Sequence, residues 1–237
     1  MDESSQPVRI LAFSDLHGGG FLEASALIDQ HRPDWIVTCG DMLPDFQQRP
    51  PNSRLRAQQE YWRDHRDLFI REGVTTTMIV GNHEAIGFRF PGMNSLPPGF
   101  EDRVVRLERI PREFGPFSFV HGLPEDELAE DLQDQFRLVP EPLIYLSHAP
   151  PYGSCDRTQM GDHIGHRPLF RHLHERDWPQ SLVLCGHVHR SFGIEEIGNT
   201  TIVNMATGYA LIEWERGFSR VLEMARMVEG GNFWDSP

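Results

Sequence analysis

Residues 8–17 read Val-Arg-Ile-Leu-Ala-Phe-Ser-Asp-Leu-His, an apolar run that passes directly into side chains able to bind a metal ion. The apolar part, residues 8–13, is short and almost uninterrupted, which predicts a strand covered on both faces. Asp15 and His17 follow two positions apart, and side chains at that spacing project to the same side of an extended backbone. The stretch therefore predicts a buried strand that delivers a carboxylate and an imidazole at its carboxyl end.

The same arrangement occurs four more times along the chain. Further apolar runs predict buried strands at residues 35–39, 76–80, 143–146 and 182–185. Polar residues follow each run at once, and they are Gly40-Asp41, Gly81-Asn82-His83-Glu84, Ser147-His148 and Gly186-His187-Val188-His189. Because loops at the carboxyl ends of strands converge in an α/β sheet, we expect these side chains to meet at one edge.

Taken singly, these motifs have ordinary structural explanations. A lone Asp-x-His, or a histidine after a strand, is more often part of a capped turn or a hydrogen-bonded core, and Gly-Asp after a strand is usually a turn. All five together, in this order and each at a strand end, are improbable as coincidence. We therefore predict a metal site built from these loops.

The order of the predicted elements indicates an α/β fold. The 237 residues suit a single domain spanning 1–237. Amphipathic helices are predicted at residues 21–30, 61–69, 125–136 and 168–176. After residue 190 a hairpin (194–197 and 200–205) and a further strand (209–214) are predicted. Strand–helix alternation followed by antiparallel strands predicts two sheets packed together, with helices outside.

Charge and composition exclude several classes of protein. Twenty-two basic and 35 acidic side chains give a net charge of −13, which argues against a groove for duplex nucleic acid. Bound divalent ions could still make the electrostatic potential positive at one local site, so a nucleotide substrate is not excluded. Twelve histidines make a metal site the first hypothesis to test. Neither a membrane span nor a signal peptide is predicted, so we expect a cytoplasmic protein with no membrane partner.

The complete set of motifs resembles the calcineurin-like metallophosphoesterase superfamily, and in particular its small stand-alone prokaryotic members. That family's pattern is DxH, GD, GNH(D/E), a lone histidine after a later strand, and GHxH, and here it spans roughly residues 10–190. The resemblance implies a four-layer α/β/β/α sandwich of two mixed β-sheets flanked by helices. It also implies a centre that binds two divalent metal ions.

The resemblance divides seven ligands between the two metal sites. Asp15, His17 and His189 would hold one ion, Asn82, His148 and His187 would hold the other, and Asp41 would bridge both. Nitrogen and oxygen ligands without thiolate suit Mn²⁺, Fe or Zn²⁺, and we predict Mn²⁺. Two such ions, about 3.5–4 Å apart, can hold a phosphoryl group and lower the pKa of a shared water, whose hydroxide attacks phosphorus.

A leaving alkoxide needs a proton, and His83 is the predicted general acid. It is adjacent to the expected ligand Asn82 but is not itself a ligand in the family pattern. Two departures from that pattern stand nearby. Many relatives have an acidic residue or Asn where this chain has Pro44, with Asp45 one position further on. Glu84 replaces the commoner Asp, and we expect it to form hydrogen bonds rather than to ligate.

The predicted substrate contacts are Asn82, His121, Arg157, His163 and His166. Arginine and histidine side chains can donate charge-assisted hydrogen bonds to phosphate oxygens, although ordinary loop polarity would also explain those residues that lie in loops. The stretch Ser-His-Ala-Pro-Pro-Tyr-Gly at residues 147–153 resembles that of small prokaryotic members. The resemblance implies phosphodiesterase or phosphomonoesterase activity on small substrates, and we predict a phosphodiesterase that acts on a small or nucleotide-type phosphoester.

Three other functions are compatible with the same motifs. A phosphomonoesterase or protein phosphatase is one, although the Asp-Arg-Gly string of Ser/Thr phosphatases is absent. A nuclease is the second, and the net charge and the absence of a basic tract interleaved with aromatics argue against it. The third is a non-catalytic scaffold. Relatives that have become scaffolds usually lack some of the metal ligands, whereas this chain keeps all seven predicted ligands and His83.

Overall fold

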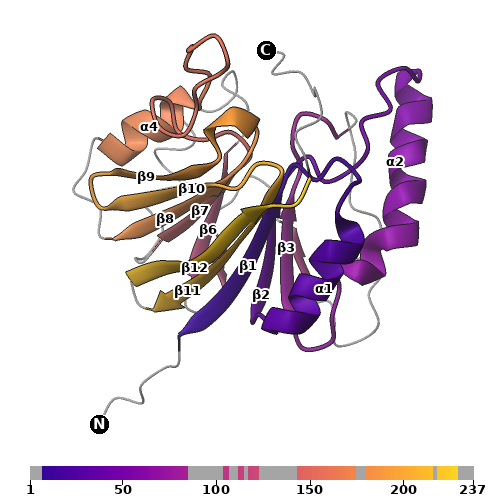
Figure 1. Ribbon diagram of the computed structural model, residues 1–237, viewed down its shortest axis with the longest axis horizontal. Helices are drawn as coiled ribbons and strands as arrows, with labels where there is room; N and C mark the ends of the chain where they lie inside the picture. Colours follow the sequence, from indigo (N-terminus) through magenta and orange to yellow (C-terminus); the bar gives the residue numbers. More distant parts are fainter. Residues whose placement is uncertain are drawn as a thin grey trace.

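Two β-sheets lie face to face in the computed structural model, with helices on their outer faces (Figure 1). The structure describes residues 7–84, 104–106, 112–114, 117–122, 143–174, 180–215 and 218–228. None of the helices in these ranges has both the length and the apolar character that a membrane crossing requires.

The first sheet is built around β1 (Val8–Ser14) and has the order β12-β11-β1-β2-β3-β4. The other strands are β2 (Trp35–Cys39), β3 (Thr75–Ile79), β4 (Val104–Arg106), β11 (Gly208–Glu215) and β12 (Phe218–Arg226). Strands β1 to β4 are parallel neighbours, whereas β11 is antiparallel to both β1 and β12. The carboxyl end of β12 therefore lies at the same edge as the carboxyl ends of β1, β2 and β3.

The second sheet has the order β5-β6-β7-β8-β10-β9. Its strands are β5 (Arg112–Phe114), β6 (Phe117–Gly122), β7 (Leu143–Ser147), β8 (Ser181–Cys185), β9 (Gly193–Ile197) and β10 (Thr200–Asn204). The four central strands are parallel and the two outer ones are antiparallel to their neighbours, so this sheet is also mixed.

Helices cover the outer face of each sheet. Helices α1 (Phe21–His31) and α2 (Pro51–His65) lie against the first sheet, and α4 (Arg167–His174) lies against the second (Figure 1). The proline at the start of α2 suits that position, because its fixed φ is helical and its missing N–H would have had no partner there. A 3₁₀ turn (Arg66–Leu68) follows α2.

Alternating side chains along the strands produce three apolar interfaces. In β1, Leu11 and Phe13 pack under α1 and α2, while Ile10 and Ala12 pack between the two sheets. In β7 of the second sheet, Ile144 and Leu146 pack between the two sheets, while Tyr145 packs with residues of α4. Three interfaces separate four layers, which confirms the predicted α/β/β/α sandwich. Burial on both faces also explains why the strands read as nearly continuous apolar runs.

Every strand predicted from the sequence is present, including the β9–β10 hairpin and β11. Strands β4, β5, β6 and β12 were not predicted. The pattern at residues 61–69 belongs to the end of α2 and the turn after it, and the helix begins earlier, at Pro51. The helix predicted at residues 125–136 lies outside the described residues.

Candidate dinuclear metal centre

The polar loops after β1, β2, β3, β7 and β8 come together at one edge of the sandwich. Main-chain hydrogen bonds join them: the N–H of Asp15 donates to the carbonyl of Gly40 at 3.0 Å, and the N–H of His17 donates to the carbonyl of Asp41 at 2.9 Å. In the second sheet the N–H of Gly186 donates to the carbonyl of His148 at 2.9 Å. The expected convergence of these loops is therefore found.

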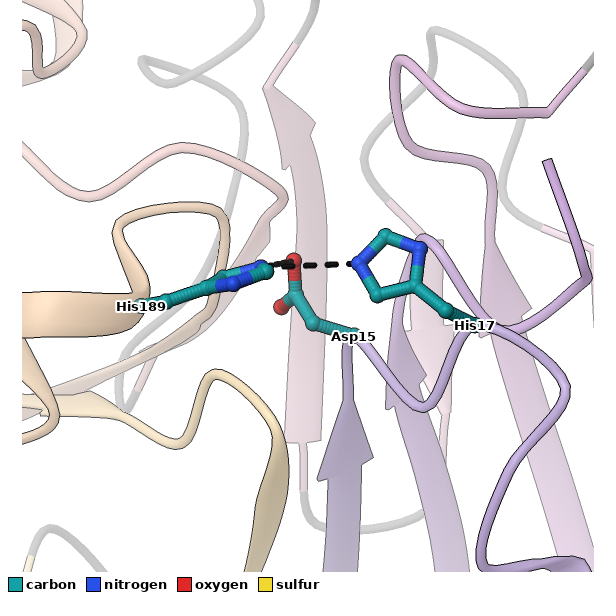
Figure 2. A group of neighbouring side chains, drawn as sticks. All are labelled: Asp15, His17 and His189. Carbon is teal, nitrogen blue, oxygen red and sulfur yellow. Dashed lines mark hydrogen bonds and ion pairs between the residues drawn. The ribbon is translucent and has the colours of Figure 1, made fainter. Parts of the chain in front are cut away.

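Asp15, His17 and His189 form the first ligand group. One possible ligand atom from each lies within 4.8 Å of the others. The Nε2 atoms of His17 and His189 are 3.4 Å apart, and the His189 Nε2 is 3.3 Å from Oδ1 of Asp15. Figure 2 shows Asp15 and His17 projecting from the loop after β1 and His189 reaching toward them from the other sheet. Imidazole nitrogens and a carboxylate oxygen that face one point in this way suit a divalent cation.

Asp41, His148 and His187 form the second ligand group, again with ligand atoms within 4.8 Å of one another. The Nε2 of His148 is 3.1 Å from Oδ2 of Asp41 and 2.7 Å from Oδ1 of Asn82. The Nδ1 of His148 lies 2.8 Å from the carbonyl oxygen of Cys39, a contact that directs Nε2 toward the ligands. All seven predicted ligands thus lie in or beside two groups, and their donor atoms fit a dinuclear site.

The backbone at this edge is strained. Asp15, His17, Asp41 and His187 have φ angles of 56°, 47°, 52° and 68°, in the left-handed region that costs a non-glycine residue about 1–2 kcal/mol. Neighbouring glycines make room for the carboxylates, since a Cβ on Gly186 would lie 2.0 Å from Oδ2 of Asp15. Such strain persists where the surrounding structure enforces it, typically at functional sites.

The charges in the two groups are strongly coupled. Burial opposes ionisation of Asp41, but the charges of His148, His83 and His17 bring its pKa well below its usual range. Burial alone would lower the pKa of His148, but the Asp41 carboxylate raises it to about 10. Burial lowers the pKa of His187 to about 4, and the charge of His148 acts in the same direction. Without metal, His148 therefore carries the positive charge that balances Asp41.

His83 lies beside both groups and is held from its far side. Its ring centre is 5.0 Å from that of His17, and the backbone N–H of His83 donates to Oδ1 of Asp41 at 2.7 Å. Its Nδ1 lies 2.7 Å from Oδ2 of Asp45, whose other oxygen pairs with Arg54 at 2.6 Å. Arg54 also donates to the carbonyl of His83 at 2.7 Å. Neither Asp45 nor Arg54 is among the site residues predicted from the sequence.

Glu84 is buried and binds the main chain. Its carboxylate accepts hydrogen bonds from the N–H groups of Gly81, Asp41 and Leu43, at 2.6, 2.9 and 3.2 Å. Burial and the nearby Asp41 charge raise its pKa to about 7, although these hydrogen bonds act against the rise. The hydrogen-bonding role expected for Glu84 is thus found, and the side chain joins the loops after β2 and β3.

The predicted substrate contacts have different surroundings. His163 is partly exposed, and its Nδ1 lies 2.5 Å from the fully buried Asp156, which also accepts hydrogen bonds from two backbone amides of the same loop. Arg157 is exposed, and its backbone N–H and carbonyl both bond to the hydroxyl of Ser191, two residues after His189. His121 pairs in register with Leu146, near the carboxyl end of β7. These three positions stay candidates.

His166 differs from the other candidates because only 4% of it is exposed. Its Nδ1 accepts a hydrogen bond from the N–H of Leu169 in the first turn of α4, at 3.2 Å. A buried side chain that caps a helix offers little surface to a substrate. His166 stays a prediction, with less accessible surface than the other candidates.

Asn204, like Asp45 and Arg54, supports the site and was not predicted from the sequence. It is fully buried, and its amide donates to the carbonyls of Val188 and Cys155 at 3.0 and 2.9 Å. It thus fixes the segment between His187 and His189. Its position at the end of β10, at the same edge as the ligands, was the one available signal.

The family assignment follows from comparison with known sequences and structures. The sequence model described as calcineurin-like phosphoesterase matches residues 8–191. The uncharacterised protein MJ1162 of Methanocaldococcus jannaschii is 28% identical over 206 residues, which cover 83% of this chain and 87% of that protein.

Two solved structures have a similar fold. The protein TT1561 of Thermus thermophilus has a TM-score of 0.62 at 15% identity, over 94% of this chain and all of that one. A dimetal phosphatase from Danio rerio has a TM-score of 0.56 at 13% identity, over 93% of this chain and all of that one. With the matched residues covering all five motifs, the chain belongs to the calcineurin-like phosphoesterase family, whose members are metal-dependent phosphoric ester hydrolases.

Proposed function

We propose that the protein is a two-metal phosphodiesterase that hydrolyses a small or nucleotide-type phosphodiester. The observation that carries this proposal is the pair of adjacent ligand groups with His83 beside them. Asp15, His17 and His189 would hold one ion, and Asn82, His148 and His187 the other. Asp41 would bridge them, in keeping with its electrostatic action on both His17 and His148. When bound, the ions supply Lewis-acid stabilisation of the phosphoryl oxygens and an activated water.

The protein's own residues would orient the ester and protonate the leaving group. The carboxylate of Asp45 on Nδ1 of His83 fixes the ring, so that Nε2 is the atom available to carry a proton to an alkoxide. The amide of Asn82 would contact a phosphate oxygen. Two side chains of the loop after β7 would contact the rest of the substrate: His163, which Asp156 holds, and Arg157, whose backbone Ser191 holds. His121 is a further proposed substrate contact.

Charge favours a diester over a monoester. A phosphomonoester dianion carries a second negative charge that cationic side chains normally offset. Beside His83, the charge of Arg54 is already balanced by Asp45 at 2.6 Å, and the chain as a whole carries −13. A diester monoanion needs less compensation from side chains in addition to the charge that the two ions would supply. Nitrogen and oxygen ligands favour Mn²⁺ as the bound metal, and three free, buried cysteines suit a reducing, cytoplasmic location.

The proposal is tested by metal analysis and a substrate panel. Elemental analysis after loading with Mn²⁺ should give two ions per chain, and Asp41→Ala should lower occupancy of both sites. The kcat/KM for bis(p-nitrophenyl) phosphate should exceed that for p-nitrophenyl phosphate, with cyclic nucleotides as further diesters. Preference for the monoester would replace the diesterase proposal with a phosphomonoesterase. Fewer than two ions at saturating metal would overturn the dinuclear proposal itself.

A further inference from the structure

The last described residues of the chain contact the backbone of the segments that carry His17 and His189. Arg226 ends β12, and the strand register places it level with Gly208, which is level with Ser14, the residue immediately before Asp15. Arg226, Met227 and Val228 lie beyond the residues that the family match covers, 8–191. We refer to these three residues as the C-terminal clamp.

Arg226 binds the backbone of a proposed ligand. Its Nη2 donates to the carbonyl oxygen of His189 at 2.6 Å, and its Nη1 donates to the hydroxyl of Thr207 at 2.9 Å. Its guanidinium carbon also lies 4.7 Å from the centre of the Phe192 ring. A planar guanidinium can make these contacts together because its donors have a fixed fork geometry. The side chain thus joins β12 to the turn that carries His189.

Thr207 anchors the clamp. It is 3% exposed and has a φ of 64°, an unfavourable conformation for a β-branched residue. Its carbonyl accepts hydrogen bonds from the N–H groups of Met227 and Val228 at 2.9 and 3.1 Å. One strained, buried residue therefore binds all three clamp residues, through its hydroxyl and its carbonyl.

The clamp also reaches the His17 side of the ligand group. His17 is followed by three glycines. A Cβ on Gly19 would lie 3.4 Å from Cγ2 of Val228, and a Cβ on Gly20 would lie 3.4 Å from Cε of Met227. The side chains of Met227 and Val228 therefore pack against the backbone of this loop. His17 and His189, which come from different sheets, are thus supported by the same short segment.

We propose that the C-terminal clamp positions His17 and His189, and that Arg226 thereby sets the metal affinity of the first site selectively. This rests on the proposed dinuclear centre. The second group has other supports: the Cys39 carbonyl contacts His148, Glu84 binds the loops of Asp41 and Asn82, and Asn204 binds the Val188 carbonyl beside His187. Loss of the clamp should therefore leave the second site unchanged.

The direction in which metal affinity changes when Arg226 is replaced distinguishes a positioning role from a purely electrostatic one. Arg226 is positively charged, and removal of a positive charge beside a cation site would raise the affinity for metal by Coulomb's law. Loss of a positioning contact lowers that affinity, typically about 10–100-fold for a group that supports a ligand. The two explanations thus predict opposite changes.

The experiment is Mn²⁺ titration of the metal-free protein, with free Mn²⁺ followed by electron paramagnetic resonance. In Arg226→Ala, the Kd of one site should rise about 10–100-fold while the other keeps its wild-type value. Arg226→Lys should behave like the alanine variant, because an ammonium group lacks the fork that reaches both oxygens. Arg220→Ala, an exposed arginine on the same strand, is the matched control and should bind both ions as the wild type does.

A double variant identifies the affected site. In His189→Ala, which removes a ligand of the first site, the further change Arg226→Ala should have no effect on the remaining ion. Two ions bound by the wild type and by Arg226→Ala with equal or tighter affinity would overturn the clamp alone. Fewer than two ions bound by the wild type would overturn the dinuclear proposal and the clamp with it.

Discussion

The Nδ1 of His83 lies 2.7 Å from Oδ2 of Asp45, so this imidazole is held by a carboxylate on the side away from the metal ligands. Asp45 follows Pro44 in the loop after β2, and this loop delivers its carboxylate to His83. The pair gives His83 the fixed orientation that a proton donor needs.

Replacement of His83 should affect substrates according to their leaving groups. In His83→Ala, cleavage of an alkyl ester should fall by a factor on the order of 10² to 10⁴, because an alkoxide needs a proton. A nitrophenyl ester should retain far more of its rate, since nitrophenolate leaves without one. The measurement is kcat/KM for both esters in both proteins. Equal losses would show that His83 only positions phosphate, and loss of a bound ion would make it a ligand.

Asp45→Asn should give a smaller version of the same pattern. The substitution keeps the shape of the side chain but replaces the carboxylate that orients Nδ1 of His83 with an amide, so alkyl ester cleavage should fall roughly 10–100-fold. Metal content should not change. Asp64→Asn, an exposed position on α2, is the control. A uniform loss on alkyl and nitrophenyl esters would contradict the link between Asp45 and proton transfer.

The left-handed backbone at His187 predicts an unusual effect of glycine. His187→Gly and His187→Ala both remove the imidazole, but only glycine tolerates a φ of 68° without strain. The glycine variant should therefore have the larger free energy of unfolding, by about 1 kcal/mol. The measurement is urea denaturation in the presence of a chelator. An alanine variant of equal or greater stability would show that the strain is absent in solution.

Metal binding should release protons. The pKa of His148 is raised to about 10 without metal, so at pH 8 this imidazole is protonated and must lose its proton to become a ligand. The pKa of His187 is lowered to about 4, and this imidazole is already neutral. Loading should therefore release at least about one proton per chain, from His148, and a further one where the shared water ionises; affinity should fall as the pH falls. Calorimetry in two buffers of different ionisation enthalpy measures the release, and none at pH 8 would contradict the assigned charge state.

Chelation should abolish hydrolysis, and Mn²⁺ should restore it better than Mg²⁺. Four imidazoles among the seven proposed ligands favour the softer ion, because Mg²⁺ prefers oxygen ligands. The measurement is the initial rate on a diester after removal of the chelator and titration with each ion. Equal rescue by Mg²⁺ would mean that the histidines do not bind the metal ions.

The loops of the site could be predicted from the sequence because each motif immediately follows a buried strand. Strands that are covered on both faces read as apolar runs, and the polar residues after them mark the edge where the loops meet. Asp45, Arg54 and Asn204 could not be predicted in this way. They act through hydrogen bonds to segments far away in sequence, and single polar residues of this kind have no periodicity to reveal them.

The unpredicted strands have a similar explanation. β4 and β5 have three residues each, too few to show an alternating pattern. β12 is longer, but it lies at the edge of its sheet and carries exposed charged residues such as Arg220. The end of this strand proved to contact the site, although nothing in its local sequence indicates so.

Each ligand group draws residues from both sheets. Asp15 and His17 come from the first sheet and His189 from the second, and Asp41 faces His148 and His187 in the same way. A metal ion held by either group is therefore a cross-link between the two sheets, in addition to their apolar packing and to hydrogen bonds such as that between His148 and the Cys39 carbonyl. Because such an ion binds the folded chain and not the separated halves, the resistance of the protein to proteolysis should follow its metal content. Loss of metal should therefore leave a chain that is both inactive and more readily degraded.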